Sequence, residues 1–315
     1  MSRIRRPTLV ILLVIAATTY PFNQLGAQSW VQQSDNGSSS AEVPLPPAET
    51  PRWQGHAVAL GANMAIGAVS AGVVRALKGE SFWRGFVRGG AGGGIAYLGK
   101  YLATQDFAGS RLVGRQTAAV GASITYNALT GRGTFETLTF PFGPFRFHHT
   151  PDGNRVTIDL VTVGGIIYAL SRPGAMFDLE NTLATSSIVF SADTIRRRAN
   201  GNDVLGRAVG GVVIYQGAAS MLTDIRNSII DHEMVHVLQH DYAGITLGSA
   251  FEGWLAGKLP EGIGKPLRYF DLGTYSVLEL IPRALGIEER DTPWEREAYF
   301  LVEELDTRRQ QRRTN

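Results

Sequence analysis

The chain has no cysteine, which excludes disulfide bonds and a lipid-modified cysteine at the mature N-terminus. Its charges nearly balance, with a formal net charge of +2 in 315 residues when histidine is neutral, so the charge gives no indication of a nucleic-acid partner. Hydrophobic residues make up 44% of the chain, which is ample for a globular core of one or two domains. Because no disulfide bond can form, the packing of these residues must hold the fold together.

The first apolar run is too short for a comfortable transmembrane helix. The first residues are basic, residues 7–18 are apolar, and small residues follow up to residue 27. This order is typical of a secretory signal peptide over residues 1–27, with an uncleaved anchor as the alternative. We therefore expect export to the periplasm or cell envelope of a bacterium. Residues 28–54 are rich in Ser, Gln, Pro and Glu, which predicts a flexible linker.

Charged residues are absent between residues 57 and 74, and glycine then recurs at Gly85, Gly89 and Gly93. Small residues at this spacing let two helix backbones approach closely, so we expect a Gly-rich helical hairpin over residues 55–104. Each glycine weakens an isolated helix by about 1 kcal/mol, so either tertiary contacts or lipid must hold these helices. Membrane association through residues 57–103 is one hypothesis, and a close-packed soluble hairpin is the other.

The apolar pattern changes to period two between residues 131 and 217, where Val, Ile, Thr, Phe and Tyr are abundant. A hairpin-turn sequence, PDGN, occupies residues 151–154. We therefore expect a β-rich region over residues 105–218 that forms an antiparallel sheet. Glycine pairs at 164–165 and 210–211 suggest bulges in it. The expected strands cover residues 134–147, 155–170, 187–191 and 207–215.

Residues 232–236 read His-Glu-Met-Val-His. In a helix, positions i and i+4 lie on one face, so His232 and His236 can both present a ring nitrogen to one metal ion. Glu233 lies one residue further round, close enough to act on water at that ion. The surrounding residues are apolar on all sides, which predicts a buried helix. A metal ion would partner all three polar side chains, and ordinary hydrogen bonds in a polar core are the alternative.

A catalytic zinc site normally takes three protein ligands and leaves a position for water. A histidine six residues after His236 would be one source, but Tyr242 stands there. His240 lies about 12 Å from His232 along the helix axis, too far to share one ion, and is expected at the rim of the site. The remaining source is a carboxylate from a later helix, and the acidic, proline-initiated segment 293–304 fits.

This combination resembles the gluzincins, zinc metallopeptidases with an HExxH helix and a downstream helix that supplies a glutamate, often just before an alanine. The resemblance covers only about the last third of the chain. It implies Glu233 as the general base. It also implies three zinc ligands: His232, His236 and Glu297. Glu295 is the competing candidate for the third ligand.

No donor for the oxyanion of the reaction is obvious from the sequence. Tyr299, Tyr242 and His240 could each be placed there, and Tyr299 is more simply explained as an aromatic core residue. The strand expected at residues 207–215 lies just before the motif helix, and a sheet edge beside a zinc site can hold an extended peptide by main-chain pairing. Peptide binding at this edge is therefore a hypothesis.

The sequence as a whole predicts an α+β fold: the Gly-rich helical hairpin, the antiparallel β-sheet, a zincin-like catalytic helix and C-terminal helices, with a zinc-binding helical region over residues 219–315. The expected function is an exported zinc metallopeptidase that hydrolyses a peptide or protein substrate through a zinc-bound water activated by Glu233. The alternative is an envelope or membrane-associated binding or assembly protein with a structural or vestigial metal site. A structural zinc site is normally closed by four protein ligands, and no clear fourth ligand is found, which favours the enzyme.

Overall fold

The fold comes from a computed structural model, and the residues that it describes are 52–195, 204–217, 223–273 and 292–314. The described chain is α+β, as the sequence predicts. The predicted signal peptide and nearly all of the predicted linker lie outside the described residues.

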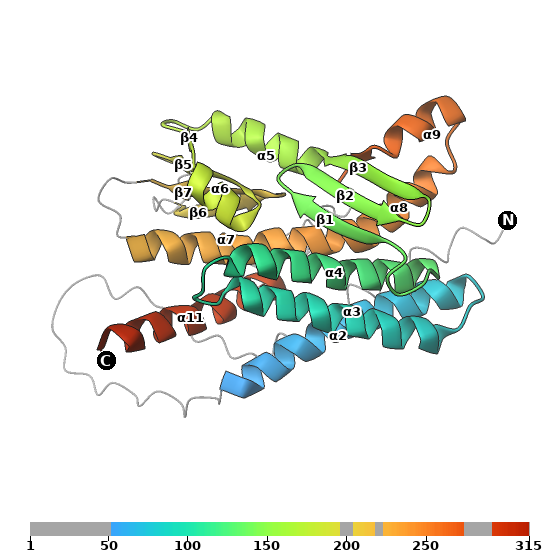
Figure 1. Ribbon diagram of the computed structural model, residues 1–315, viewed down its shortest axis with the longest axis horizontal. Helices are drawn as coiled ribbons and strands as arrows, with labels where there is room; N and C mark the ends of the chain where they lie inside the picture. Colours follow the sequence, from blue (N-terminus) through green and yellow to red (C-terminus); the bar gives the residue numbers. More distant parts are fainter. Residues whose placement is uncertain (1–51, 196–203, 218–222, 274–291, 315) are drawn as a thin grey trace.

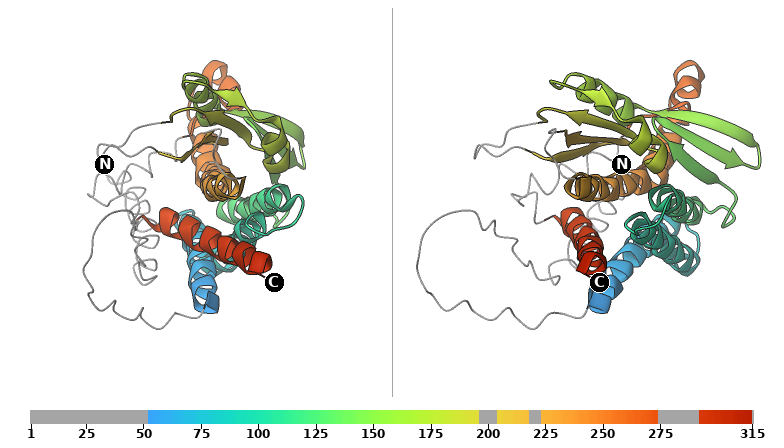
Figure 2. Two further views of the ribbon diagram at one scale, coloured as in Figure 1. Left: turned by 90° about the vertical axis from the view of Figure 1, so that its left-hand side faces the viewer. Right: turned by 60° about the vertical axis from the view of Figure 1, so that its left-hand side comes forward.

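A layer of long helices, one central helix and two small sheets make up the molecule (Figure 1). The central helix α7 lies between the helical layer and the sheets, contacting α3 and α4 on one side and β6 and β7 on the other (Figure 2). The C-terminal helix α11 contacts α7. The bounds of these helices are α2 Arg52–Leu77, α3 Phe82–Ala103, α4 Ser110–Thr130, α7 Thr223–Ala243 and α11 Pro293–Thr314.

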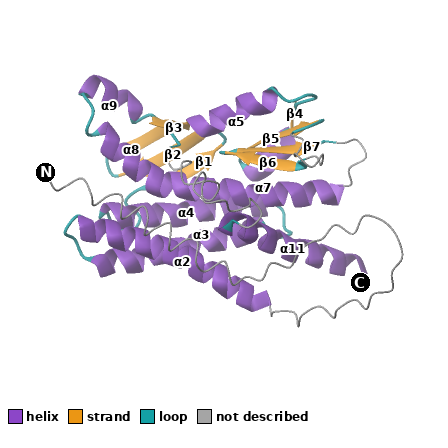
Figure 3. Cartoon of the chain, turned by 180° about the vertical axis from the view of Figure 1, so that it is seen from behind, coloured by secondary structure: helices purple, strands orange, loops and turns teal. Residues whose placement is uncertain are grey.

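Two four-stranded sheets lie on the same side of α7 (Figure 3). One has the strand order β1-β2-β3-β8 and the other β4-β5-β7-β6. The prediction of one antiparallel sheet is therefore corrected, because β3 pairs with β8, and β5 with β7, in parallel. The strands are β1 Leu138–Phe142, β2 Phe145–Thr150, β3 Gly153–Asp159, β4 Met176–Phe177, β5 Ile188–Ala192, β6 Gly206–Val209, β7 Val212–Gln216 and β8 Phe270–Asp271.

Helices interrupt the region 105–218 that was predicted to be β-rich. The helix α4 fills its beginning, and α5, Leu160–Leu170, replaces the second half of an expected strand. The carboxylate of Asp159 caps α5, accepting from the backbone N–H groups of Val161 and Thr162 at 3.0 and 3.1 Å. The glycine pair 164–165 consequently lies in a helix, and Gly210, with φ of 61°, lies in the turn between β6 and β7 instead of a bulge.

Shorter helices complete the described fold. They are α6 Leu179–Thr185, α8 Ser249–Ala256 and α9 Glu261–Leu267, together with a π-helical segment, Gly244–Gly248, that joins α7 to α8.

The Gly-rich helices pack backbone against backbone. Gly67 of α2 and Gly89 of α3 face each other so closely that a methyl group on either would overlap the other's carbonyl. On its other side α3 packs equally closely against α4, where Gly99 lies against Ala118. The glycines thus serve helix–helix contacts, as expected for small residues at this spacing. Among the described helices, α2 is long and apolar enough to cross a membrane, and a little under half of its apolar stretch (44%) is buried in the fold.

Apolar contacts on two sides hold α7 in place. Toward the sheet, Ile230 and Met234 pack against Val189 and Val213 of neighbouring parallel strands. On another side, Val235 belongs to a cluster that contains Ala298 and Leu301 of α11 and Ala59 of α2. Burial of these side chains fixes both the rotation of α7 and the position of α11, so that the beginning of α11 lies against the middle of α7.

Candidate metal centre

The two histidines of the HExxH motif lie side by side on α7. Because they are four residues apart on a regular helix, their rings share one face. The Nε2 atoms of His232 and His236 are 3.2 Å apart. Both side chains are largely buried, and each keeps about a sixth of its surface exposed, so that solvent can reach them.

The third member of the cluster is Glu295, in the first turn of α11. This helix begins at Pro293, and Thr292 caps it by accepting from the N–H of Glu295 at 3.4 Å. One carboxylate oxygen of Glu295 lies 3.3 Å from Nε2 of His232, and the other lies 3.3 Å from Nε2 of His236. Among the described residues, the ligand atoms of these three side chains, all within 4.8 Å of one another, form the one group able to hold a metal ion.

Glu297, which the resemblance implied as third ligand, does not join this cluster. Its side chain is 4% exposed and forms an ion pair with Lys100 of α3, with Nζ and Oε2 2.7 Å apart. Residues two apart on a helix point about 200° from each other, so Glu295 and Glu297 face different neighbours. The structure therefore brings the competing candidate to the histidines.

The cluster carries opposite charges at short range. Burial alone would raise the pKa of Glu295, but hydrogen bonds from the two histidines and their charges hold it well below its usual range. Burial by itself would lower the pKa of His236, but its hydrogen bond and Coulomb attraction to Glu295 raise it to about 9. Two imidazoles and one carboxylate that converge in this way suit a zinc ion, which takes nitrogen and oxygen ligands in tetrahedral sites.

Glu233 lies on the sheet side of α7, beside the strand β6. It is 7% exposed and accepts a hydrogen bond from the backbone N–H of Ala208. Burial raises the pKa of Glu233, although the two histidines partly oppose this. A buried carboxylate with a raised pKa, next to candidate metal ligands, is chemically able to act as a general base.

Glycine at position 206 makes room for this carboxylate. A Cβ atom on Gly206 would lie 2.6 Å from Oε1 of Glu233, closer than side-chain atoms approach one another. Sequence reasoning did not identify Gly206, because only the tertiary packing of β6 on α7 brings the two residues together.

Three side chains were considered as oxyanion donors, and one of them contacts the cluster. The ring of Tyr299 lies 4.5 Å from that of His232, centroid to centroid, and about half of the side chain is exposed. The hydroxyl of Tyr242 donates instead to Thr125, and burial raises its pKa to about 12. The ring of His240 lies 3.0 Å from a carboxylate oxygen of Asp159, which also pairs with Arg146, so it is engaged away from the candidate metal ligands.

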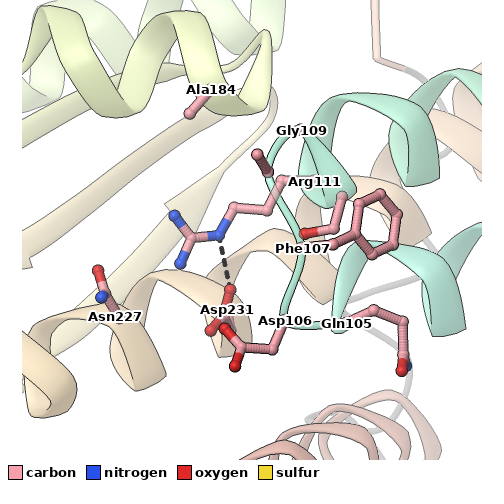
Figure 4. A pocket seen from close by; sticks show the side chains of 10 residues that line it. Gln105, Asp106, Phe107, Gly109, Arg111, Ala184, Asn227 and Asp231 are labelled. Carbon is pink, nitrogen blue, oxygen red and sulfur yellow. Dashed lines mark hydrogen bonds and ion pairs between the residues drawn. The ribbon is translucent and has the colours of Figure 1, made fainter.

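A polar cavity of about 300 Å³ opens on the adjoining face of α7, between the α3–α4 turn and α6 (Figure 4). Asp231, which directly precedes His232, lines it and accepts from Nε of Arg111 at 2.7 Å. Arg111 also donates to Asn181 of α6 at 3.3 Å. These contacts tie α4 and α6 to α7 next to the cluster, and none of the three candidate metal ligands lines the cavity.

Comparisons with protein-family models, curated proteins and solved structures found no match. Because a fold does not by itself imply a function, any functional conclusion must come from the residues of the site.

One further signal lies in the sequence just after the motif. Gln239 stands three residues after His236, and residues three apart in a helix share a face. Nδ1 of His236 lies 2.9 Å from Oε1 of Gln239. The amide of Gln239 is therefore hydrogen-bonded to His236, a contact that the helical spacing could have indicated.

Proposed function

We propose that the chain is a zinc-dependent metallopeptidase. The observation that carries this proposal is the convergence of His232, His236 and Glu295 from two helices that lie far apart in the sequence. Two imidazoles and a carboxylate are the donor set of an open, catalytic zinc site, which leaves a position for water and substrate.

The chain's own residues supply the remaining chemistry. A zinc ion held by the three side chains would polarise the carbonyl group of the substrate and lower the pKa of water beside it. The carboxylate of Glu233 accepts the proton of the attacking water and then donates it to the departing amine. Its burial beside Ala208 raises its pKa and suits it to both steps.

The strand β6 is the proposed support for the substrate backbone. Within the described residues it pairs only with β7 and forms an edge of its sheet. The N–H of Ala208 donates to Glu233, so the edge away from β7 faces the site. An extended peptide added along this edge would place a main-chain carbonyl near the cluster, which favours a peptide or protein substrate.

We further propose that the enzyme acts outside the cytoplasm, in the periplasm or cell envelope of a bacterium. This part rests on the sequence alone: a basic start, an apolar run over residues 7–18 and small residues up to residue 27.

Metal content measured together with peptide hydrolysis tests the proposal. The purified wild-type protein should contain about one zinc ion per chain. Glu295→Ala should lose the zinc and the activity, whereas Glu233→Gln should keep the zinc and lose the activity. Glu303→Ala, at an exposed position of the same helix, is the control and should change neither. Zinc-free, correctly folded wild-type protein, or unchanged turnover in Glu233→Gln, would contradict the proposal.

An envelope-associated binding protein is the second candidate, and α2 is the observation that favours it. This helix is apolar and long enough to cross a membrane. Leu60 and Met64 on α2 and Leu98 on α3 are exposed large apolar residues. Flotation with lipid vesicles distinguishes the candidates: vesicle binding that Leu60→Ser and Met64→Ser abolish, in a protein without zinc, would favour the binding protein.

A further inference from the structure

The carboxylate of Glu297 is the centre of a buried polar cluster behind the candidate metal site. It accepts from Nζ of Lys100 at 2.7 Å, from Nδ2 of Asn63 at 2.7 Å and from Nε2 of Gln239 at 2.9 Å. Lys100 also donates to Oδ1 of Asn63 at 2.9 Å, and its side chain is 5% exposed. Side chains from four helices thus meet at one carboxylate. A buried lysine is rare unless it is paired, so this arrangement needs a reason.

The Gly-rich helices make this meeting possible. Gly93 of α3 packs directly against the backbone of Asn63 of α2, where a Cβ atom would overlap the carbonyl group. Lys100 lies seven residues after Gly93, two helical turns further on the same face. The close approach of α2 and α3 therefore brings Asn63 and Lys100 to the same carboxylate.

The carboxylate of Glu297 determines which atoms donate and which accept in the hydrogen bonds that lead to the metal site. An ionised carboxylate only accepts, so the amide nitrogen of Gln239 must face Glu297 and its oxygen must face His236. That oxygen only accepts as well, so Nδ1 of His236, 2.9 Å away, must carry a proton. In the neutral ring, Nε2 then keeps its lone pair, and it is Nε2 that lies 3.3 Å from Glu295.

We propose that Lys100, Glu297 and Gln239 form a positioning relay that sets the tautomer and the ring orientation of His236 for metal binding. This inference rests on the proposed metal site. The Gly-rich helices α2 and α3 then have a role in the site, because they lie behind it and supply Asn63 and Lys100. Groups that orient a histidine ligand from behind typically change metal affinity 10- to 100-fold when they are removed.

The test compares variants that break the relay with a variant that breaks an equally buried ion pair outside it. Gln239→Leu removes the link to His236 and leaves Glu297 with Lys100 and Asn63. The double variant Lys100→Met with Glu297→Gln removes both charges together, which avoids an unpaired buried charge. Arg115→Met with Asp241→Asn is the matched control, because this buried ion pair, 2.8 Å apart, also joins two helices, α4 and α7.

Zinc affinity is the first readout, measured on the full chain by competition with a chelator. Gln239→Leu and the Lys100–Glu297 double variant should each weaken zinc binding about 10- to 100-fold. Combining them should cause little further loss, since residues of one relay are not additive. The control should bind zinc with wild-type affinity. Unchanged affinity in Gln239→Leu, or an equal loss in the control, would overturn the relay while leaving the metal site itself intact.

The second readout needs no metal, so it separates failure of the relay from failure of the proposed function. Nitrogen-15 NMR of metal-free protein reports whether Nδ1 of His236 carries a proton that is protected from exchange with water. The relay predicts a protected Nδ1–H in the wild type, bonded to Gln239, and loss of that protection in Gln239→Leu. An unprotonated or unprotected Nδ1 in the wild type would overturn the relay even if no zinc binds.

Discussion

At the scale of single residues, the absence of a methyl group at Gly206 determines where the candidate base lies. A Cβ there would meet Oε1 of Glu233 at 2.6 Å and a side-chain carbon of Ile229 at the same distance. The carboxylate is the end of a flexible side chain, so it would move before the backbone did.

The variant Gly206→Ala should therefore impair turnover more than stability. We expect the rate of peptide hydrolysis to fall on the order of 10- to 100-fold, because a misplaced catalytic group is costly. Zinc content should stay close to that of the wild type, and the unfolding temperature should fall only modestly, because the branched side chain of Ile229 must also shift. Gly164→Ala is the control, since this exposed glycine has nothing within 4 Å of the added carbon. Wild-type turnover in Gly206→Ala would contradict the position of Glu233.

Glu295 and Glu297 differ in the side chains that reach each of them. Both follow the motif at an ordinary distance, and both lie in the same acidic first turns of α11. What separates them is a lysine and an asparagine that reach Glu297 from α3 and α2, about 200 residues earlier in the chain. The motif predicts His232 and His236 because their spacing is local, and it cannot predict which carboxylate a distant helix engages.

At the scale of elements, local signals predict some segments and miss others. The helix α7 extends over Thr223–Ala243, where the apolar pattern and the acidic first turn indicate a helix. The helix α4 was missed because Gly114 and Gly121 weaken its local helical pattern, and these glycines instead fit against Ala103 and Ala96 of α3. Residues 155–170 read as one strand, but Asp159 caps a helix in their middle. Such changes depend on tertiary contacts that override local preference.

The first sheet contains a buried histidine that should make stability depend on pH. His148 of β2 lies between Thr139 of β1 and Thr157 of β3, with ring nitrogens 3.0 and 2.8 Å from their hydroxyl oxygens. Burial, with the charges of Arg155 and Arg146, lowers the pKa of His148 to about 3. The unfolded chain takes up this proton at about pH 6.5. The folded state therefore loses stability as the pH falls from about 6.5 to about 3.

Replacement of His148 by glutamine tests this effect, because an amide can still bond both threonines and does not titrate. Between pH 7 and pH 4, the wild type should lose roughly 3 kcal/mol more of its free energy of unfolding than His148→Gln. Urea unfolding at each pH measures the difference. The neighbouring His149→Gln, at an exposed position, should retain the wild-type dependence. Parallel curves for the wild type and His148→Gln would show that His148 does not titrate as described.

At the scale of the whole molecule, buried charges join the layers around α7. Arg146 of β2 pairs with Asp159 at 2.9 Å and with Asp271 of β8, and it approaches Asp241 of α7 to 3.9 Å. Arg115 of α4 binds Asp241 from the other side at 2.8 Å. Breaking one partner of such a pair typically costs 3–5 kcal/mol, about as much as a large cavity in the core. The helix that carries the histidines is thereby fixed to both the helical layer and the sheets.

Anomalous X-ray diffraction from crystals of the zinc-loaded protein shows directly whether His232, His236 and Glu295 hold one zinc ion. We expect a single strong zinc peak at bonding distance, about 2.0–2.2 Å, from Nε2 of each histidine and from a carboxylate oxygen of Glu295, with Glu297 still bound to Lys100. A peak at another set of residues, or no peak between the two histidines at saturating zinc, would contradict this expectation.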